Sequence, residues 1–129
     1  MAFRFLIVDD SPAMRAVVRR VLAMTGLPVD GCWEAANGQE ALDLLANQSV
    51  DLILTDINMP SMDGEQFVAR LQTLDACRDI PVLVVSSAQT ELRAQRLLAL
   101  GARGFVKKPF LPETLREQLL QVLGVPDAT

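Results

Sequence analysis

Short apolar runs alternate along the chain with longer segments in which apolar residues recur every three or four positions. The short runs predict buried strands, and the longer segments predict amphipathic helices. The predicted strands are Phe3–Val8, a run near Cys32–Ala35, Leu52–Thr55, Val82–Val85 and a run around Phe105–Lys107. Because strands and helices alternate, we expect right-handed crossovers and a parallel sheet covered by helices on both faces.

The first two predicted helices carry start signals. Ser11 is expected to cap the first helix, and Pro12 fits the first helical position, where its missing N–H costs nothing. The turn-forming segment 25–28 ends this helix. Asn37 followed by Glu40 resembles a capping box at the start of the second helix.

The remaining three helices are expected to begin at Asp63, after Thr90 and after Pro112, and the fourth helix is expected to end at Gly101. No further element is predicted beyond Gly124. The apolar positions of the five helices are Met14, Val17, Val18, Val21, Leu22, Ala41, Leu42, Leu45, Phe67, Val68, Leu71, Leu74, Leu92, Leu97, Leu98, Leu115, Leu119, Val122 and Leu123.

Four of the five predicted strands end at polar residues with related chemistry. Asp9 and Asp10 follow the first strand, Asp56 the third, Ser86 the fourth and Lys108 the fifth. Ligands of open α/β sheets bind outside the carboxyl ends of the strands. Five strands fit the flavodoxin-like order 2-1-3-4-5, in which the first and third strands are neighbours. We therefore expect the three carboxylates to converge at one point.

Three converging carboxylates repel one another unless a counter-charge is present. Mg²⁺ prefers oxygen ligands and typically takes one or two carboxylates together with phosphate. Two charges from the metal and one from Lys108 would balance the three carboxylates, so that a phosphoryl dianion is tolerated. An aspartate can act as a nucleophile and form an acyl phosphate. Lys108 would then neutralise charge, and Ser86 would donate a hydrogen bond to a phosphoryl oxygen.

The overall charge argues against several other classes of protein. Twelve basic residues stand against 16 acidic ones, which gives a net charge of −4 and none of the excess positive charge expected of a nucleic-acid-binding protein. No apolar run reaches the roughly 18 residues of a membrane span. The N-terminus shows no signal-peptide pattern. We expect a cytoplasmic protein without membrane insertion.

Two residue types exclude or restrict particular chemistries. Cys32 and Cys77 lie in different predicted elements without CxxC spacing, so we expect reduced, structural thiols. The chain contains no histidine, which excludes a Ser-His-Asp triad and histidine-based zinc sites. If phosphoryl chemistry uses a histidine, a partner protein must supply it.

Four blocks of this sequence, in order and at these spacings, resemble the receiver domain of two-component response regulators. The blocks are Val8-Asp9-Asp10, the segment 56–60 with Asp63-Gly64 behind it, Ser86, and Lys108-Pro109-Phe110. The resemblance covers essentially the whole chain and implies one receiver domain over residues 1–129 without an output domain.

The resemblance also implies roles for individual residues. Asp56 matches the phosphoacceptor, Asp9 and Asp10 match the Mg²⁺-binding acids, and the backbone carbonyl of Asn58 is implied as a further ligand. Ser86 matches the switch hydroxyl and Lys108 the phosphate-binding lysine. The family usually has a cis peptide bond before the proline that Pro109 matches.

Three residues depart from the family pattern. Many receivers have Thr where this chain has Ser86, so the hydroxyl is kept. Chemotaxis-type receivers have Tyr where Phe105 stands; its ring can still move between outward and inward positions but offers no hydroxyl to a partner. Ala88, two residues after the switch hydroxyl, cannot orient a water molecule. Phe105 is nevertheless our predicted switch residue, with a permanently buried core residue as the alternative.

The first hypothesis is a stand-alone response regulator. It would accept a phosphoryl group from a sensor histidine kinase onto Asp56, and would bind a target protein on the face formed by helix four, strand five and helix five. It would catalyse only its own phosphorylation and dephosphorylation. An alternative is a relay intermediate that exchanges the phosphoryl group with a histidine-phosphotransfer protein.

Two hypotheses come from other classes. Small aspartyl-phosphate phosphohydrolases also use an aspartate at a strand end, but they require an Asp-x-Asp motif, whereas Asp9 and Asp10 are adjacent. A flavodoxin-like FMN-binding protein would need a first loop rich in Ser, Thr and Gly to hold phosphate, and the two aspartates would repel it.

Overall fold

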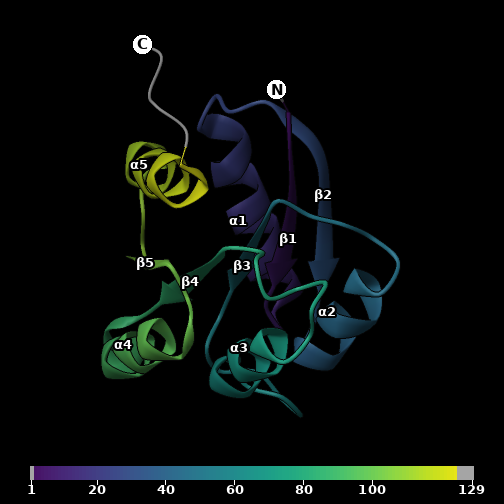
Figure 1. Cartoon of the computed structure of the whole chain (residues 1–129). Coiled ribbons are helices and arrows are strands. Elements are labelled where there is room, and N and C mark those ends of the chain that lie inside the picture. Colours follow the sequence, from purple (N-terminus) through teal and green to yellow (C-terminus); the bar gives the residue numbers. More distant parts are fainter. Residues whose placement is uncertain (1, 125–129) are drawn as a thin grey trace.

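The computed structural model describes residues 2–124 and contains the predicted flavodoxin-like fold, a five-stranded parallel sheet in the order β2-β1-β3-β4-β5 (Figure 1). The strands are β1 (Phe3–Val8), β2 (Val29–Ala35), β3 (Leu52–Thr55), β4 (Val82–Ser86) and β5 (Gly104–Lys107). The second strand thus begins at Val29, earlier than the run near Cys32 predicted, because Phe3 at the start of β1 pairs with Val29.

Helices cover both faces of this sheet (Figure 1). They are α1 (Pro12–Met24), α2 (Gly38–Leu45), α3 (Gly64–Gln72), α4 (Glu91–Leu100), which follows a short 3₁₀ helix η1 (Ala88–Thr90), and α5 (Pro112–Leu123). One core cluster packs α1 and α5 against the sheet, and a second packs α2, α3 and α4 against its other face. Most strand residues are buried, as expected for a parallel sheet covered on both sides.

The register of the strands aligns their carboxyl ends. Val8 at the end of β1 pairs with Thr55 at the end of β3, and Thr55 pairs with Val84 of β4. Ser86 at the end of β4 pairs with Lys107 at the end of β5. The residues that follow these four strands therefore start from one edge of the sheet.

The helix starts follow the predicted signals with one difference. The Ser11 side chain accepts a hydrogen bond from the N–H of Met14, and Pro12 occupies the first turn of α1. Asn37 caps α2 by accepting a hydrogen bond from the N–H of Glu40. The expected reciprocal bond differs, because the Glu40 carboxylate accepts from the N–H of Ala36, at 3.1 Å, instead of that of Asn37.

Asp63 forms a complete capping box with Gln66 at the start of α3. This helix ends at Gln72, so Leu74, predicted on it, lies beyond its end, half-buried against the core. Within residues 2–124, no helix combines the length and the hydrophobicity needed to cross a membrane. The segment beyond Gly124, where no element was predicted, lies outside the described residues.

Two apolar positions predicted on the helices are exposed to solvent. Leu92 on α4 is 75% exposed and Val17 on α1 is 49% exposed. The buried side of α4 carries Ala94 and Leu97. Leu92 precedes Leu97 by five positions, which at 3.6 residues per turn is about 140° around the helix. Leu92, named among the apolar positions of the fourth helix, therefore does not belong to its buried side.

Candidate functional site

Three carboxylates come together at the carboxyl edge of the sheet, as the sequence predicted. Asp9 and Asp10 directly follow β1, and Asp56 directly follows β3, which is paired with β1. One carboxylate oxygen from each residue lies within 4.8 Å of the other two. Asp9 is buried, Asp56 is half-buried and Asp10 is exposed, so the cluster opens to solvent on the side of Asp10.

Backbone hydrogen bonds orient two of these carboxylates. The N–H of Ser11 donates to Oδ1 of Asp9 at 2.9 Å, and the N–H of Ile57 donates to Oδ1 of Asp56 at 2.8 Å. The guanidinium of Arg15 donates to the backbone carbonyl of Asp9 at 2.6 Å, which ties α1 to the end of β1. The carboxylates are thus held by the loops that carry them.

The environment of Asp9 disfavours its ionised form. Burial raises the pKa of Asp9, and the hydrogen bond from the N–H of Ser11 opposes this effect. The negative charge of Asp56 raises this pKa further, the positive charge of Lys108 lowers it, and Asp10 raises it again. Because the pKa is raised overall, the cluster favours binding of an additional positive charge.

Lys108 supplies one internal positive charge to the cluster. Its Nζ lies 3.7 Å from Oδ1 of Asp56 and 3.9 Å from Oδ2 of Asp9. The peptide bond between Lys108 and Pro109 is cis, as the resemblance implied, and the N–H of Lys108 donates to the carbonyl of Ser86 at 2.7 Å. The loop after β5 is thereby joined to the end of β4.

Ser86 places a hydroxyl in a fully buried position at the end of β4. Its exposure is 0%, and in the part of the chain that the structure describes its Oγ has no hydrogen-bond partner. Ser86 does not cap a helix, because the N-cap of η1 is Ser87 and that of α4 is Thr90. A buried hydroxyl without a protein partner is unfavourable, so the Oγ of Ser86 is free to donate to an acceptor from outside the described residues.

The donor set fits a hard divalent cation. Three carboxylates within 4.8 Å of one another offer the oxygen ligands that Mg²⁺ prefers, and the open side of the cluster leaves space for water or phosphate. Lys108 remains on the buried side, beside Asp9 and Asp56. The arrangement therefore suits a metal ion together with an anionic group.

The comparison with known proteins decides the family. Residues 5–120 match the family profile of the response regulator receiver domain. The chain belongs to this family. A chemotaxis protein CheY homolog of Campylobacter jejuni is 36% identical over 94% of this chain and 92% of its own length. Chemotaxis protein CheY1 of Helicobacter pylori is 32% identical over 96% of this chain and 99% of its own length.

Solved structures share the receiver fold. The chemotaxis response regulator CheY4 of Vibrio cholerae is 34% identical and superposes with a TM-score of 0.81 over 95% of this chain and 99% of its own. The receiver domain of a Pseudomonas aeruginosa sensor histidine kinase, solved with a magnesium ion in its active-site cleft, has a TM-score of 0.82 at 22% identity, over 96% of this chain and 99% of its own. That likeness concerns the fold.

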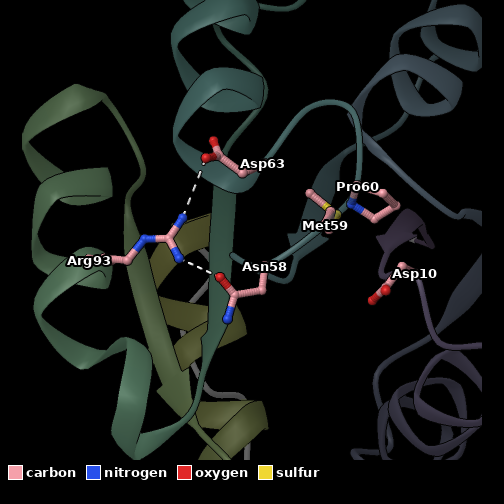
Figure 2. A pocket seen from close by; sticks show the side chains of 6 residues that line it. All are labelled: Asp10, Asn58, Met59, Pro60, Asp63 and Arg93. Carbon is pink, nitrogen blue, oxygen red and sulfur yellow. Dashed lines mark hydrogen bonds and ion pairs between the residues drawn. The ribbon is translucent and has the colours of Figure 1, made fainter.

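A cleft of about 520 Å³ adjoins the carboxylate cluster of this receiver domain. Figure 2 shows Arg93 reaching from α4 towards Asn58 and Asp63 on one side of the cleft, with Asp10 on the other. Met59 and Pro60 lie between them. The Asn58 side chain accepts a hydrogen bond from Arg93. Sequence analysis missed Arg93, although an arginine in the first turn of α4 and two acids at the start of α3 were visible signals.

Phe105 lies on β5, where it is half-buried against the core cluster on the α2–α4 face. It also lines a groove of about 400 Å³ together with Phe110, Leu111 and residues of α5. Leu111 is 66% exposed, so this surface presents apolar area to solvent. The ring of Phe105 therefore lies between the core and the surface, the position from which a change of rotamer would alter both.

Proposed function

We propose that this receiver domain acts in the cytoplasm as a stand-alone response regulator. It accepts a phosphoryl group from the phosphohistidine of a sensor histidine kinase onto Asp56 and then binds a target protein. The observation that carries the proposal is the position of Asp56, with its carboxylate within 4.8 Å of two further carboxylates and 3.7 Å from the ammonium of Lys108. Membership in the receiver family supports the same assignment.

In the transfer step, a carboxylate oxygen of Asp56 attacks the phosphorus atom and the P–N bond to the partner's imidazole breaks. The electron pair of that bond goes to the imidazole nitrogen, and an acyl phosphate forms on Asp56. The ammonium of Lys108 neutralises charge on the phosphoryl oxygens, and the hydroxyl of Ser86 donates a hydrogen bond to one of them. These two groups orient the phosphoryl group after transfer.

Mg²⁺ is the cofactor that this site would hold. Asp9, Asp10, Asp56 and the backbone carbonyl of Asn58 would bind it, and it would supply positive charge to the phosphoryl oxygens. Without that charge, the three carboxylates would repel a phosphoryl dianion. Asp9 and Asp10 thus favour binding of the cation, while Asp56 provides the nucleophile.

The output surface is the face formed by α4, β5 and α5. Once Ser86 binds the phosphoryl group, its movement gives the Phe105 ring space to pack inward. An inward ring changes the apolar groove that Phe105 shares with Phe110 and Leu111, so a target protein would distinguish the two states. NMR of the Phe105 ring with and without beryllofluoride tests this step, and one unchanged buried environment would contradict it.

The test of the proposed function is phosphorylation by acetyl phosphate in the presence of Mg²⁺. Asp56→Asn should remove label incorporation, because an amide cannot replace the carboxylate nucleophile. Asp43→Asn is the matched control, since Asp43 is exposed on α2 and bonds to Gln39. Label on the Asp56→Asn variant at the parental rate would refute the assignment.

The fate of the phosphoryl group separates the remaining roles. A messenger keeps its label when mixed with histidine-phosphotransfer proteins, whereas a relay intermediate transfers the label to one of them. Turnover of a generic phosphate ester by the parent protein would instead favour the aspartyl-phosphate phosphohydrolase.

A further inference from the structure

Arg93 connects α4 to the loop that follows the phosphoacceptor. Its Nε donates to Oε1 of Glu65 at 2.6 Å. Its Nη2 lies 3.5 Å from Oδ2 of Asp63, and its Nη1 donates to the side-chain oxygen of Asn58; Figure 2 shows these two contacts. The three acceptors lie in the loop between β3 and α3 and in the first turn of α3. One side chain of α4 thus binds both parts of the neighbouring segment.

This contact suits arginine in particular. The planar guanidinium presents its N–H groups in a rigid fork, and here three of its nitrogens point to three different residues. Lysine has a single ammonium on a flexible stem and cannot reproduce that geometry. The Arg93 side chain is 29% exposed and Glu65 is 26% exposed, so solvent screens their ion pair only in part.

The segment held by Arg93 is continuous with the phosphorylation site. Asn58 follows Asp56 by two positions, and the N–H of Gly64 donates to the carbonyl of Ile57 at 2.7 Å. A Cβ atom at Gly64 would lie 2.9 Å from the carbonyl oxygen of Asp56 and 3.3 Å from a methyl group of Leu97 on α4. Side chains of α4 therefore pack close to the backbone that carries Asp56.

The first turn of α4 also contacts β5. Glu91 forms an ion pair with Lys107, with 2.6 Å between Oε1 of Glu91 and Nζ of Lys107. Lys107 immediately precedes the site residue Lys108. Arg93 and Glu91 thus join the start of α4 to the Asp56 loop and to β5, respectively. Arg93 is therefore placed where it would transmit a displacement of the Asp56 loop to α4, a helix of the proposed output surface.

We propose that Arg93 is a positioning residue that couples the loop after Asp56 to α4, so that phosphorylation changes the output surface. This inference rests on the proposed function. It predicts that Arg93→Ala leaves beryllofluoride binding at Asp56 in place but reduces the response of α4 to it.

The experiment is amide hydrogen exchange of residues 94–100 with and without beryllofluoride and Mg²⁺, with occupancy of the site measured by ¹⁹F NMR. Exchange rates report the local opening of α4 and not the global fold. In the parent, saturating beryllofluoride should change these rates. In Arg93→Ala, the ratio of the rates with and without beryllofluoride should lie at least about fivefold closer to one than in the parent. Arg93→Lys should not restore the parental ratio.

Arg96→Ala is the matched control, since Arg96 is exposed on the same helix and, among residues 2–124, makes no ion pair. Its ratio should equal that of the parent. If Arg93→Ala does not fold, Glu65→Gln removes the charge from the shorter of the two ion pairs of Arg93 while keeping the shape of the side chain. That variant should show a reduced ratio as well.

The outcomes separate this inference from the proposed function. If the parent fails to bind beryllofluoride, the proposed function fails. If the parent binds it but α4 does not respond, or responds equally in Arg93→Ala, the assignment of Arg93 is overturned while the proposed function stands. A parental ratio in Glu65→Gln, where Arg93→Ala cannot be prepared, overturns the assignment in the same way.

Discussion

Replacing Ser86 by alanine should stabilise the unphosphorylated protein and weaken its function. The Oγ of Ser86 is fully buried and has no hydrogen-bond partner within the described residues. A buried hydroxyl in that condition costs about 1–3 kcal/mol, whereas the small void left by its removal costs only a few tenths of a kcal/mol. The free energy of unfolding should therefore rise by about 1 kcal/mol in Ser86→Ala.

Urea unfolding without Mg²⁺ measures this change, which corresponds to an increase in Tm of roughly 4 °C for a domain of this size. Ser87→Ala makes the same chemical change one residue later. Ser87 Oγ lies 3.2 Å from Oγ1 of Thr90 and 3.3 Å from Oε1 of Gln89, so that variant should not gain stability. A loss of stability in Ser86→Ala would show that the hydroxyl is bonded in the resting protein and would refute the reasoning.

The same substitution should act in the opposite direction on ligand binding. If Ser86 donates to a phosphoryl oxygen, its loss removes one hydrogen bond to a charged group, which is worth about 1.5–3 kcal/mol. Beryllofluoride affinity should therefore fall at least about tenfold, as measured by ¹⁹F NMR titration. Unchanged affinity would exclude the proposed contact, whatever the effect on stability.

Three further predictions concern the surroundings of the site. Asp10→Ala should weaken Mg²⁺ binding in a calorimetric titration and stabilise the metal-free protein, because it removes one of three carboxylates within 4.8 Å; unchanged Mg²⁺ affinity would contradict the metal site. Gly64→Ala should lower the free energy of unfolding by about 1–3 kcal/mol, because its Cβ would lie 2.9 Å from the carbonyl oxygen of Asp56. Burial alone would raise the pKa of Glu34, but hydrogen bonds and charges from two arginines outweigh it and lower this pKa. A lowered folded-state pKa contributes stability above the unfolded value of about 4.3, and that stability is lost as the pH falls; urea unfolding of Glu34→Gln should therefore decline less steeply than the parent between about pH 5 and pH 3.

The fold and the carboxylate cluster could be predicted because their signals are local. Asp9 and Asp56 each follow an apolar strand directly, and Lys108 follows β5. Parallel strands bring their carboxyl ends to one edge, so the order of the strands is enough to place these residues together. The positions of Ser11 and Pro12 at the start of α1 were likewise set by backbone hydrogen bonding within one turn.

Contacts between neighbouring helices could not be predicted in this way. The hydrogen bond between Arg93 and Glu65 joins residues 28 positions apart, and it depends on how α3 and α4 pack side by side. The exposure of Leu92 has a similar cause, because only the packing of α4 decides which side of the helix is buried. The Glu40 carboxylate accepts from the N–H of Ala36, one residue before Asn37, and the sequence pattern does not distinguish these two donors.

The order of the strands has a consequence for the time at which the site becomes complete during synthesis. β1 lies inside the sheet, between β2 and β3, whereas β5 lies at its edge and is the last strand to be made within residues 2–124. A nascent chain can therefore pair β1 with β3 and bring the carboxylates of Asp9 and Asp56 together before Lys108 exists to offset their charge. We expect a chain truncated before β5 to incorporate no phosphate from acetyl phosphate, even where circular dichroism shows helical content. The ability to accept phosphate would then report that β5 has docked on the sheet.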